Sequence, residues 1–170
     1  MKTKSILLAV TGLTPQVVTE TLYAMHQQGQ PLPEQIHILT TAEGHQRARL
    51  TLINDGWLAR FYSDYQLPKP DFAERHIHIL QQANGEVLHD IRTQADNRAM
   101  ADGITEWIRT LTADPDTALH VSIAGGRKTM GFYAGYALSL YGRPQDRLSH
   151  VLVPADYESH PQFYYPHAEV

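Results

Sequence analysis

The chain has 170 residues, of which 42% are hydrophobic and 19% charged, so it can bury a core and does not belong to the disordered class. Its net charge of −4 at pH 7 argues against binding of long nucleic acid through an extended basic surface. The absence of cysteine excludes disulfides and thiolate chemistry. No apolar run is long enough to span a membrane, and the run at residues 5–10 is too short for a signal peptide. We therefore expect a cytoplasmic protein with no membrane partner.

Strand-like and helix-like segments alternate along the chain. Runs rich in Val, Ile and Leu predict parallel strands that are covered on both faces, at residues 5–10, 35–39, 75–80, 119–124 and 149–153. Apolar residues at spacings of three and four predict four helices between them, over residues 15–25, 50–61, 100–111 and 130–141. The pattern predicts one α/β domain over residues 1–170, with a Rossmann-like, doubly wound, mainly parallel sheet.

Two smaller features qualify this pattern. Asn84 and Gly85 suggest a small hairpin within residues 81–92, between the third strand and the third helix. Thr14 is a good helix cap, with Pro15 suited to the first helical turn, so capping is the role that we expect for Thr14.

The topology predicts where a ligand binds. In doubly wound sheets, ligands occupy the crevice beyond the carboxyl ends of the strands, at the point where the connections diverge. With strand order 3-2-1-4-5, residues 11–16 (TGLTPQ) lie beside residues 125–129 (GGRKT). Gly125 and Gly126 permit a close backbone approach, the following helix N-terminus favours an anion, and Arg127 and Lys128 add two positive charges. These features predict a phosphate-binding site.

Familiar nucleotide and metal motifs do not account for this turn. A Walker loop needs a glycine directly before its lysine, but Arg127 stands there, and the dinucleotide fingerprint is absent after the first strand, where only Gly12 occurs. Glu43 and Asp156 are scattered carboxylates, and the ten histidines form no helical metal motif. We therefore expect neither a cofactor nor a metal.

The segments SIAGGRKTM and TGLTPQVVTETLYAM together resemble the CRISPR-associated Rossmann-fold (CARF) family. The similarity is to the branch that includes standalone ring nucleases and the N-terminal sensor domains of type III CRISPR ribonucleases, and it extends to VLVPADYESHPQFYYP. It implies a homodimer that binds cyclic tetra- or hexa-adenylate across its two-fold axis. It further implies that some members cut the ring.

The chemistry of such cleavage can be derived from the substrate. Each RNA phosphodiester carries an adjacent 2′-OH as its own nucleophile, so an enzyme need only align that group and stabilise the charge on the phosphorane, without a metal. We assign this work to Lys128, Arg127 and Thr11, the last of which we expect to be open to the ligand. The expected ligand-binding residues are Gly12, Thr14, Gln16, Gly125, Gly126 and Thr129.

Two further readings stay open at this point. One is a CARF sensor that binds the ring without cutting it and regulates an effector, and the other is an unrelated nucleotide or phosphosugar enzyme on the same fold. A built-in effector is disfavoured, because Pro144 and the strand pattern at His150 do not fit the helical Arg–His motif of those ribonucleases. The aromatic residues Phe163, Tyr164 and Tyr165 are expected to cover the sheet or a partner subunit rather than to stack on adenine.

Overall fold

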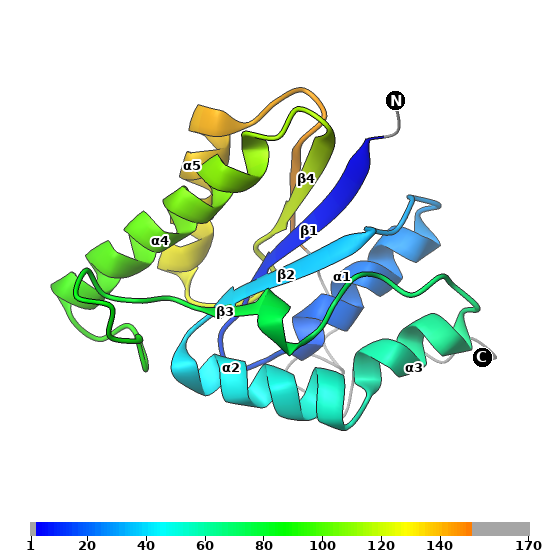
Figure 1. The fold of residues 1–170 in the computed structure, drawn as a ribbon, viewed down its shortest axis with the longest axis horizontal. Coiled ribbons are helices and arrows are strands. Elements are labelled where there is room, and N and C mark those ends of the chain that lie inside the picture. Colours follow the sequence, from blue (N-terminus) through cyan, green and yellow to red (C-terminus); the bar gives the residue numbers. More distant parts are fainter. Residues whose placement is uncertain (1–2, 151–170) are drawn as a thin grey trace.

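Five parallel strands form one sheet in the order β3-β2-β1-β4-β5, with helices on both faces (Figure 1). The structure is a computed structural model and describes residues 3–150. The elements along the chain are β1 (Lys4–Val10), α1 (Gln16–Gln27), β2 (Gln35–Thr40), α2 (Ala42–Ala48), the π-helix η1 (Arg49–Asn54), α3 (Trp57–Asp64), the 3₁₀-helix η2 (Glu74–His76), β3 (Ile77–Ile79), α4 (Gln94–Thr112), β4 (Thr117–Ser122), α5 (Lys128–Tyr141) and β5 (Arg147–Ser149).

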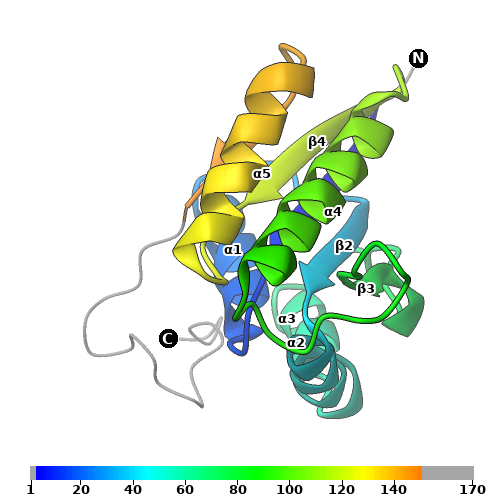
Figure 2. The ribbon, with the colours of Figure 1, turned by 90° about the vertical axis from the view of Figure 1, so that its left-hand side faces the viewer.

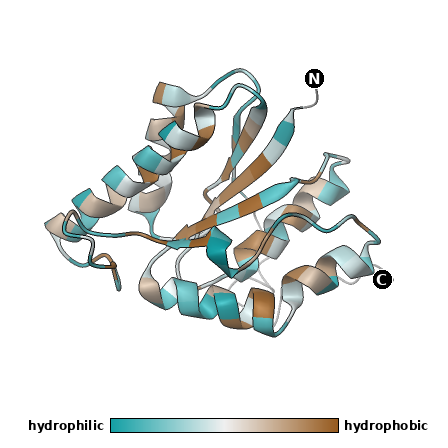
Figure 3. Ribbon diagram, viewed as in Figure 1, coloured by the Kyte–Doolittle hydropathy of each residue, from teal (hydrophilic) through white to brown (hydrophobic). Residues whose placement is uncertain are grey.

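The central strand β1 divides the core into two layers because successive side chains point to opposite faces. Leu8 and Val10 pack with α4 and α5, whereas Leu7 and Ala9 pack with α1, η1 and α3. Figure 2 shows α4 and α5 together on one face, with α2 and α3 on the other, and Figure 3 shows the hydrophobic character of β1 and β2 between them. The single-domain, doubly wound α/β fold and its strand order are confirmed.

Three predicted segments differ in detail from the structure. The helix predicted over residues 50–61 is divided into η1 and α3, because Gly56 between them adopts a left-handed φ of 76°. The third strand is shorter than predicted, since residues 74–76 form η2. The fifth strand spans Arg147–Ser149, so it begins and ends earlier than the predicted 149–153, of which residues 151–153 lie outside the described residues.

The small hairpin predicted after the third strand is confirmed. Gln81 and Val87 form an antiparallel bridge, and Gly85 takes the φ of 90° that the turn requires. The chain then returns across the carboxyl edge of the sheet to residues 88–91, where Ala42 donates a backbone hydrogen bond to Leu88. This excursion places the loop after β3 close to the loops after β1 and β4.

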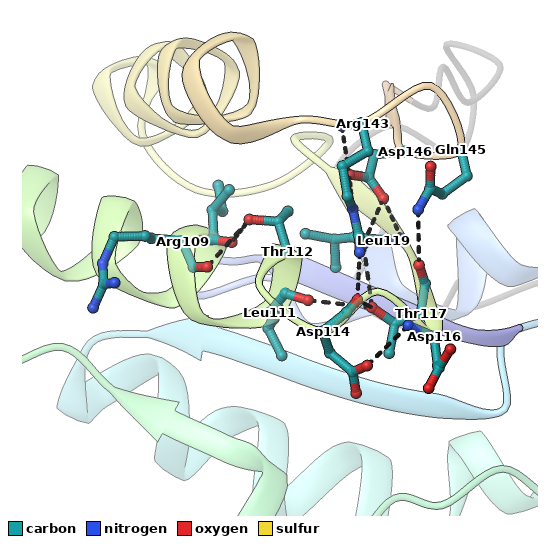
Figure 4. Close-up of polar contacts among 11 residues, drawn as sticks. Arg109, Leu111, Thr112, Asp114, Asp116, Thr117, Leu119, Arg143, Gln145 and Asp146 are labelled. Carbon is teal, nitrogen blue, oxygen red and sulfur yellow. Dashed lines mark hydrogen bonds and ion pairs between the residues drawn. The ribbon is translucent and has the colours of Figure 1, made fainter.

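A polar network ties the short edge strand β5 to β4 (Figure 4). The Asp146 carboxylate, 1% exposed, accepts from Arg143 Nε at 2.9 Å and from the backbone N–H of Leu119 at 2.8 Å. Arg143 also donates to Thr117 Oγ1 and to the Asp114 carbonyl. Each buried charge therefore has partners, as burial of an ion pair requires.

Within the part of the chain that the structure describes, no helix combines the length and hydropathy needed to cross a bilayer.

Candidate ligand-binding site

The loops after β1 and β4 meet at the switch point, as predicted. Gly12 and Gly126 approach so closely that a Cβ on Gly12 would lie 3.3 Å from the Cα of Gly126. A Cβ on Gly125 would lie 2.8 Å from Val17 Cγ2, and Gly126 has a φ of 82°. The glycine pair is thus required both by the space between the loops and by the backbone of the turn.

A pocket of about 280 Å³ opens between these loops. The loop after β1, the start of α2, the excursion after β3 and the turn into α5 all contribute to its wall. Its lining residues are Gly12, Leu13, Thr14, Thr41, Glu43, Asp90, Ile91, Gly126, Arg127 and Met130. A larger adjoining groove of about 600 Å³ shares Glu43 and Asp90 and continues along residues 82–92.

The nine predicted site residues fall into three groups. Gly12, Thr14, Gly126 and Arg127 line the pocket. Lys128 and Thr129 are exposed in the first turn of α5 and lie outside the pocket lining, while Gly125 supports the turn from behind. Thr11 and Gln16 are buried, at 1% and 8% exposure.

The two threonines of the loop after β1 depart from the roles that the sequence predicted for them. Thr11 follows the central strand directly and its N–H bonds the Leu39 carbonyl, so its side chain is enclosed and its Oγ1 has no hydrogen-bond partner among residues 3–150. The prediction that Thr11 is open to a ligand is therefore wrong. The expected capping role of Thr14 is also wrong, because Pro15 occupies the N-cap of α1 without a side-chain cap and Thr14 is exposed in the pocket.

The sequence did not indicate the partner of Arg127. The Arg127 guanidinium binds both oxygens of the Asp90 carboxylate, with Nη2 at 2.9 Å from Oδ1 and at 3.0 Å from Oδ2. Arg127 is the largest cause that lowers the pKa of Asp90 to about 2, and the backbone N–H of Ile91 and the Arg92 side chain act in the same direction. Asp90 therefore stays ionised at neutral pH and partly neutralises the positive charge predicted for this turn.

Arg127 nevertheless keeps donors for a ligand. Its bonds to Asp90 use Nε and Nη2, so Nη1 has no partner among the described residues. Asp90 fixes the plane of the guanidinium at the pocket wall. The Lys128 side chain forms no hydrogen bond or ion pair with any of residues 3–150. Lys128 is also the first residue of α5, and the first N–H groups of a helix have no partner within the helix. The site combines one cation that is oriented by a carboxylate, Arg127, with one cation that has no side-chain partner among residues 3–150, Lys128.

Glu43 enters the pocket from the first turn of α2. The helix is capped by Thr41, whose Oγ1 accepts from the Gly44 N–H at 3.3 Å. Gly44 permits α2 to approach the site loop, since a Cβ there would lie 2.6 Å from the Gly12 carbonyl oxygen. Glu43 and Asp90 thus supply two carboxylates that could accept hydrogen bonds from ribose hydroxyls or base amino groups.

Within residues 3–150, no group of three or more His, Asp or Glu side chains is arranged to hold a metal ion. His37 and His78 do lie side by side on the sheet, with Nδ1 of His37 at 2.9 Å from Nε2 of His78, and His78 packs on Trp107. Burial is the main cause that lowers the pKa of both histidines to about 4. Asp156 and the aromatic residues 163–165 lie outside the described residues.

The family comparison uses nearly the whole chain. The sequence model of the family described as CRISPR-associated protein NE0113 matches residues 14–170, which include both site loops from Thr14 onward. The chain belongs to this family. Membership of this CRISPR-associated family indicates a role in CRISPR defence, which agrees with the broader part of the resemblance inferred from the two loops.

Other comparisons of this NE0113-family chain add little about function. No curated protein matches it. Among solved structures, it is similar to the crystal structure of a proposed UDP-N-acetylglucosamine 2-epimerase from Listeria monocytogenes, with 17% sequence identity and a TM-score of 0.41. That similarity covers 87% of this chain but only 31% of the epimerase chain.

Proposed function

We propose that this NE0113-family chain is a CARF domain that binds cyclic oligoadenylate, as a homodimer, and cleaves it. The observation that carries the proposal is the convergence of the loops at residues 11–16 and 125–129 on one pocket at the switch point of the sheet. Membership of a CRISPR-associated family supports a nucleotide signal of that defence as the ligand.

The pocket residues divide the work of binding. The free Nη1 of Arg127 and the N–H groups at the start of α5 receive phosphate oxygens. The exposed hydroxyl of Thr14, which the sequence had already placed among the ligand-binding residues, orients a phosphate or a ribose. Glu43 accepts hydrogen bonds from the sugar or base, so that the two carboxylates of the site contribute to recognition of the nucleoside.

Cleavage proceeds by attack of the ribose 2′-oxygen on the adjacent phosphorus. The new P–O2′ bond forms as the P–O5′ bond breaks, the 2′-OH proton is lost and the 5′-oxygen is protonated. The product is a linear oligoadenylate with a 2′,3′-cyclic phosphate and a 5′-hydroxyl. Lys128 stabilises the charge that develops on the phosphoryl oxygens, since its ammonium has no partner among residues 3–150 and is carried by a long side chain with several rotatable bonds.

The sensor function is the second candidate, and the same pocket favours it. Asp90 and Glu43 reduce the net positive charge available for transition-state stabilisation, which suits binding better than catalysis. Incubation of the pure chain with cyclic tetra- and hexa-adenylate, followed by chromatography and mass measurement, separates the candidates. Linear products with a 2′,3′-cyclic phosphate support cleavage, a tightly bound but intact ring supports the sensor, and no binding of either ring contradicts both.

A further inference from the structure

Strands β4 and β5 have one polar face. Leu119 and Val121 of β4 pack with α5 in one core layer, so the alternate residues of β4 point to the side of the sheet that carries α1. The register of β4 with β5 places two residues of β5 on that same side. The polar side chains of this face are His120, Ser122, Arg147 and Ser149. Strands of a doubly wound sheet are usually apolar on both faces, so β4 and β5 depart from the pattern.

Exposure to water does not explain this polar face, because most of it is enclosed. His120 and Ser122 are only 7% and 1% exposed. Ser122 Oγ lies 3.2 Å from Thr21 Oγ1 of α1, and His120 Nε2 is hydrogen-bonded to Ser149 Oγ. Burial of polar groups is costly unless they have partners, and these two contacts supply them for the hydroxyl groups and for Nε2.

His120 Nδ1 is the exception in this cluster. The atom is buried and has no hydrogen-bond partner among residues 3–150. Burial, and to a smaller degree repulsion from Arg147, lowers the pKa of His120 to about 4, so the ring is neutral at pH 7. When the Ser149 hydroxyl donates to Nε2, the one proton of the neutral ring is on Nδ1. His120 then has a buried N–H group that needs an acceptor.

A pocket of about 310 Å³ lies at this face, and we call it the β4–β5 pocket. Its wall is formed by β4, β5 and the C-terminal part of α1, and His120, Arg147 and Ser149 belong to its lining. It shares no lining residue with the pocket at the switch point. Its volume is in the range of small-molecule sites.

The charges around the β4–β5 pocket favour an anion. Arg147 is exposed, and its guanidinium forms no hydrogen bond or ion pair with any of residues 3–150. No carboxylate of the described residues lines this pocket, whereas Glu43 and Asp90 line the pocket at the switch point. A chain with a net charge of −4 therefore has here a pocket with an unpaired cation and no acidic side chain.

The end of α1 does not oppose an anion at this place. The C-terminal carbonyl groups of a helix often lack partners, but here the N–H groups of residues 28–30 bond the carbonyl oxygens of residues 24–26. Gly29 adopts the φ of 69° that this cap requires. Gln28 Oε1 accepts from Gln30 Nε2 at 2.7 Å, which leaves the amide nitrogen of Gln28 to donate. The helix end thus adds a donor to the lining of the pocket.

A guanidinium, an imidazole N–H and a side-chain amide from three different elements are donors that suit a tetrahedral oxyanion, whose several oxygens can accept from different directions. We propose that the β4–β5 pocket binds inorganic phosphate or a small phosphate monoester, with Arg147, Gln28 and His120 Nδ1 as donors. Ser149 is a positioning residue, because its hydroxyl holds the proton of His120 on Nδ1. This site does not depend on cyclic oligoadenylate or on the proposed function.

Backbone amide NMR of the full chain tests the site without an activity assay. Titration with inorganic phosphate should shift the amide signals of residues 28–30 and 147–150, and the signals of residues 125–129 report separately on the switch point. Tighter binding of ribose 5-phosphate than of inorganic phosphate supports a monoester as the ligand, and equal or weaker binding supports free phosphate. The absence of shifts at residues 28–30 and 147–150 with about 10 mM of either probe overturns the proposal.

The role of Arg147 is tested by a matched pair of variants. Arg147→Gln should weaken phosphate binding at these amides by about tenfold, because a charge-assisted hydrogen bond is lost, and its melting temperature should not change because the side chain is exposed. Arg98→Gln removes an exposed arginine of α4 outside the β4–β5 pocket and should bind as wild type does. Equal losses in the two variants would show only an adventitious ion attracted by net charge and would overturn the proposal.

The positioning role of Ser149 has a spectroscopic test. The ¹⁵N chemical shifts of the His120 ring should show the proton on Nδ1 in the wild type. Ser149→Ala should lose this preference and weaken phosphate binding by about threefold, and Ser149→Thr should restore both. A proton on Nε2 in the wild type contradicts the proposed donor.

A carboxylate of the chain itself is the alternative occupant of the β4–β5 pocket. Residues 151–170 follow His150, which lines the pocket, and their sequence contains Asp156 and Glu158. Phosphate binding should therefore be measured in a variant that combines Asp156→Asn with Glu158→Gln, and it should equal that of the wild type. If only this variant binds phosphate, the pocket is a site for the chain's own carboxylates and the proposal is wrong.

Discussion

Asp90 holds the guanidinium of Arg127 through both carboxylate oxygens, and this pair joins the excursion after β3 to the turn that begins α5. Two segments separated by 37 residues in the sequence therefore share one wall of the pocket. The arginine is held in a fixed orientation by a carboxylate that also reduces its charge.

Asp90→Asn should leave the fold almost as stable as wild type, because ion pairs with this degree of exposure contribute at most about 1 kcal/mol. Single-turnover cleavage of the ring should slow by about tenfold, since Arg127 loses the partner that orients it. Arg92→Gln, which removes an exposed contact with the same carboxylate, is the matched control and should cleave at the wild-type rate. An unchanged rate for Asp90→Asn would show that the orientation of Arg127 does not matter for cleavage.

Lys128→Ala should lower the cleavage rate far more than the affinity for the ring. An unpaired cation that acts on developing phosphoryl charge contributes about 2–4 kcal/mol to lowering the barrier. Rates measured at saturating enzyme, together with dissociation constants, separate the two effects. Lys69→Ala removes an exposed lysine that lies outside the pocket and should cleave normally. If the Lys128→Ala variant cuts the ring at the wild-type rate, the catalytic role proposed for this turn is wrong.

Thr14→Ala and Thr11→Val should have opposite effects. Thr14→Ala removes an exposed pocket hydroxyl and should weaken ring binding by about 1 kcal/mol with little change in stability. Thr11→Val replaces a buried hydroxyl that has no partner among residues 3–150, so it should raise the free energy of unfolding by about 1 kcal/mol and leave binding unchanged. Urea titration and a binding assay on both variants check this. Weakened binding in Thr11→Val alone would restore the role predicted from the sequence.

Cleavage should persist in excess EDTA, because the 2′-OH supplies the nucleophile and the proposed charge stabilisation comes from Lys128 and Arg127. Product formation with EDTA, and with EDTA followed by added magnesium or manganese, measures the dependence. Activity that is lost with the chelator and returns with the metal would contradict this mechanism.

Acidification below about pH 6.5 should destabilise the fold. Burial, together with repulsion from neighbouring histidines, keeps the pKa values of His37 and His78 near 4, below the value of about 6.5 in an unfolded chain. The unfolded state therefore binds more protons between these pH values, so the stabilisation is fully present above pH 6.5 and is lost as the pH falls towards 4. Urea unfolding at pH 7 and pH 5 should differ by about 1 kcal/mol for each histidine, which is about half of what the pKa difference alone gives, because solvent screens both partly exposed rings. The difference should shrink in His78→Gln, and an unchanged difference would assign it to other groups.

The sequence predicted the strands of a doubly wound sheet, because strand hydrophobicity and strand ends are local properties. The meeting of the two glycine-containing loops followed only once the order 3-2-1-4-5 was assumed, and the structure has that order. The Asp90–Arg127 pair was not predicted, because no feature of the sequence around Asp90 indicates that its side chain lies close to Arg127 in the fold. Which of Thr11 and Thr14 reaches the pocket depends on the residue at which the chain after β1 stops being enclosed by its neighbours, and that residue is not marked in the sequence. Periodicity also concealed the division of the second helix, because Leu50, Ile53 and Trp57 keep helical spacing across the left-handed Gly56.

The turn at Gly126 limits how this family can vary. Its φ of 82° is strained for any residue with a side chain, and a Cβ there would approach the sulfur of Met130 to 2.9 Å. Natural sequences that keep the crevice should therefore keep this glycine, whereas the exposed Lys128 can change without strain in the backbone. Under the proposed function, a lineage would lose or regain ring cleavage through a single codon while the binding crevice persists, so that sensors and nucleases would be separated by one substitution at the first residue of α5.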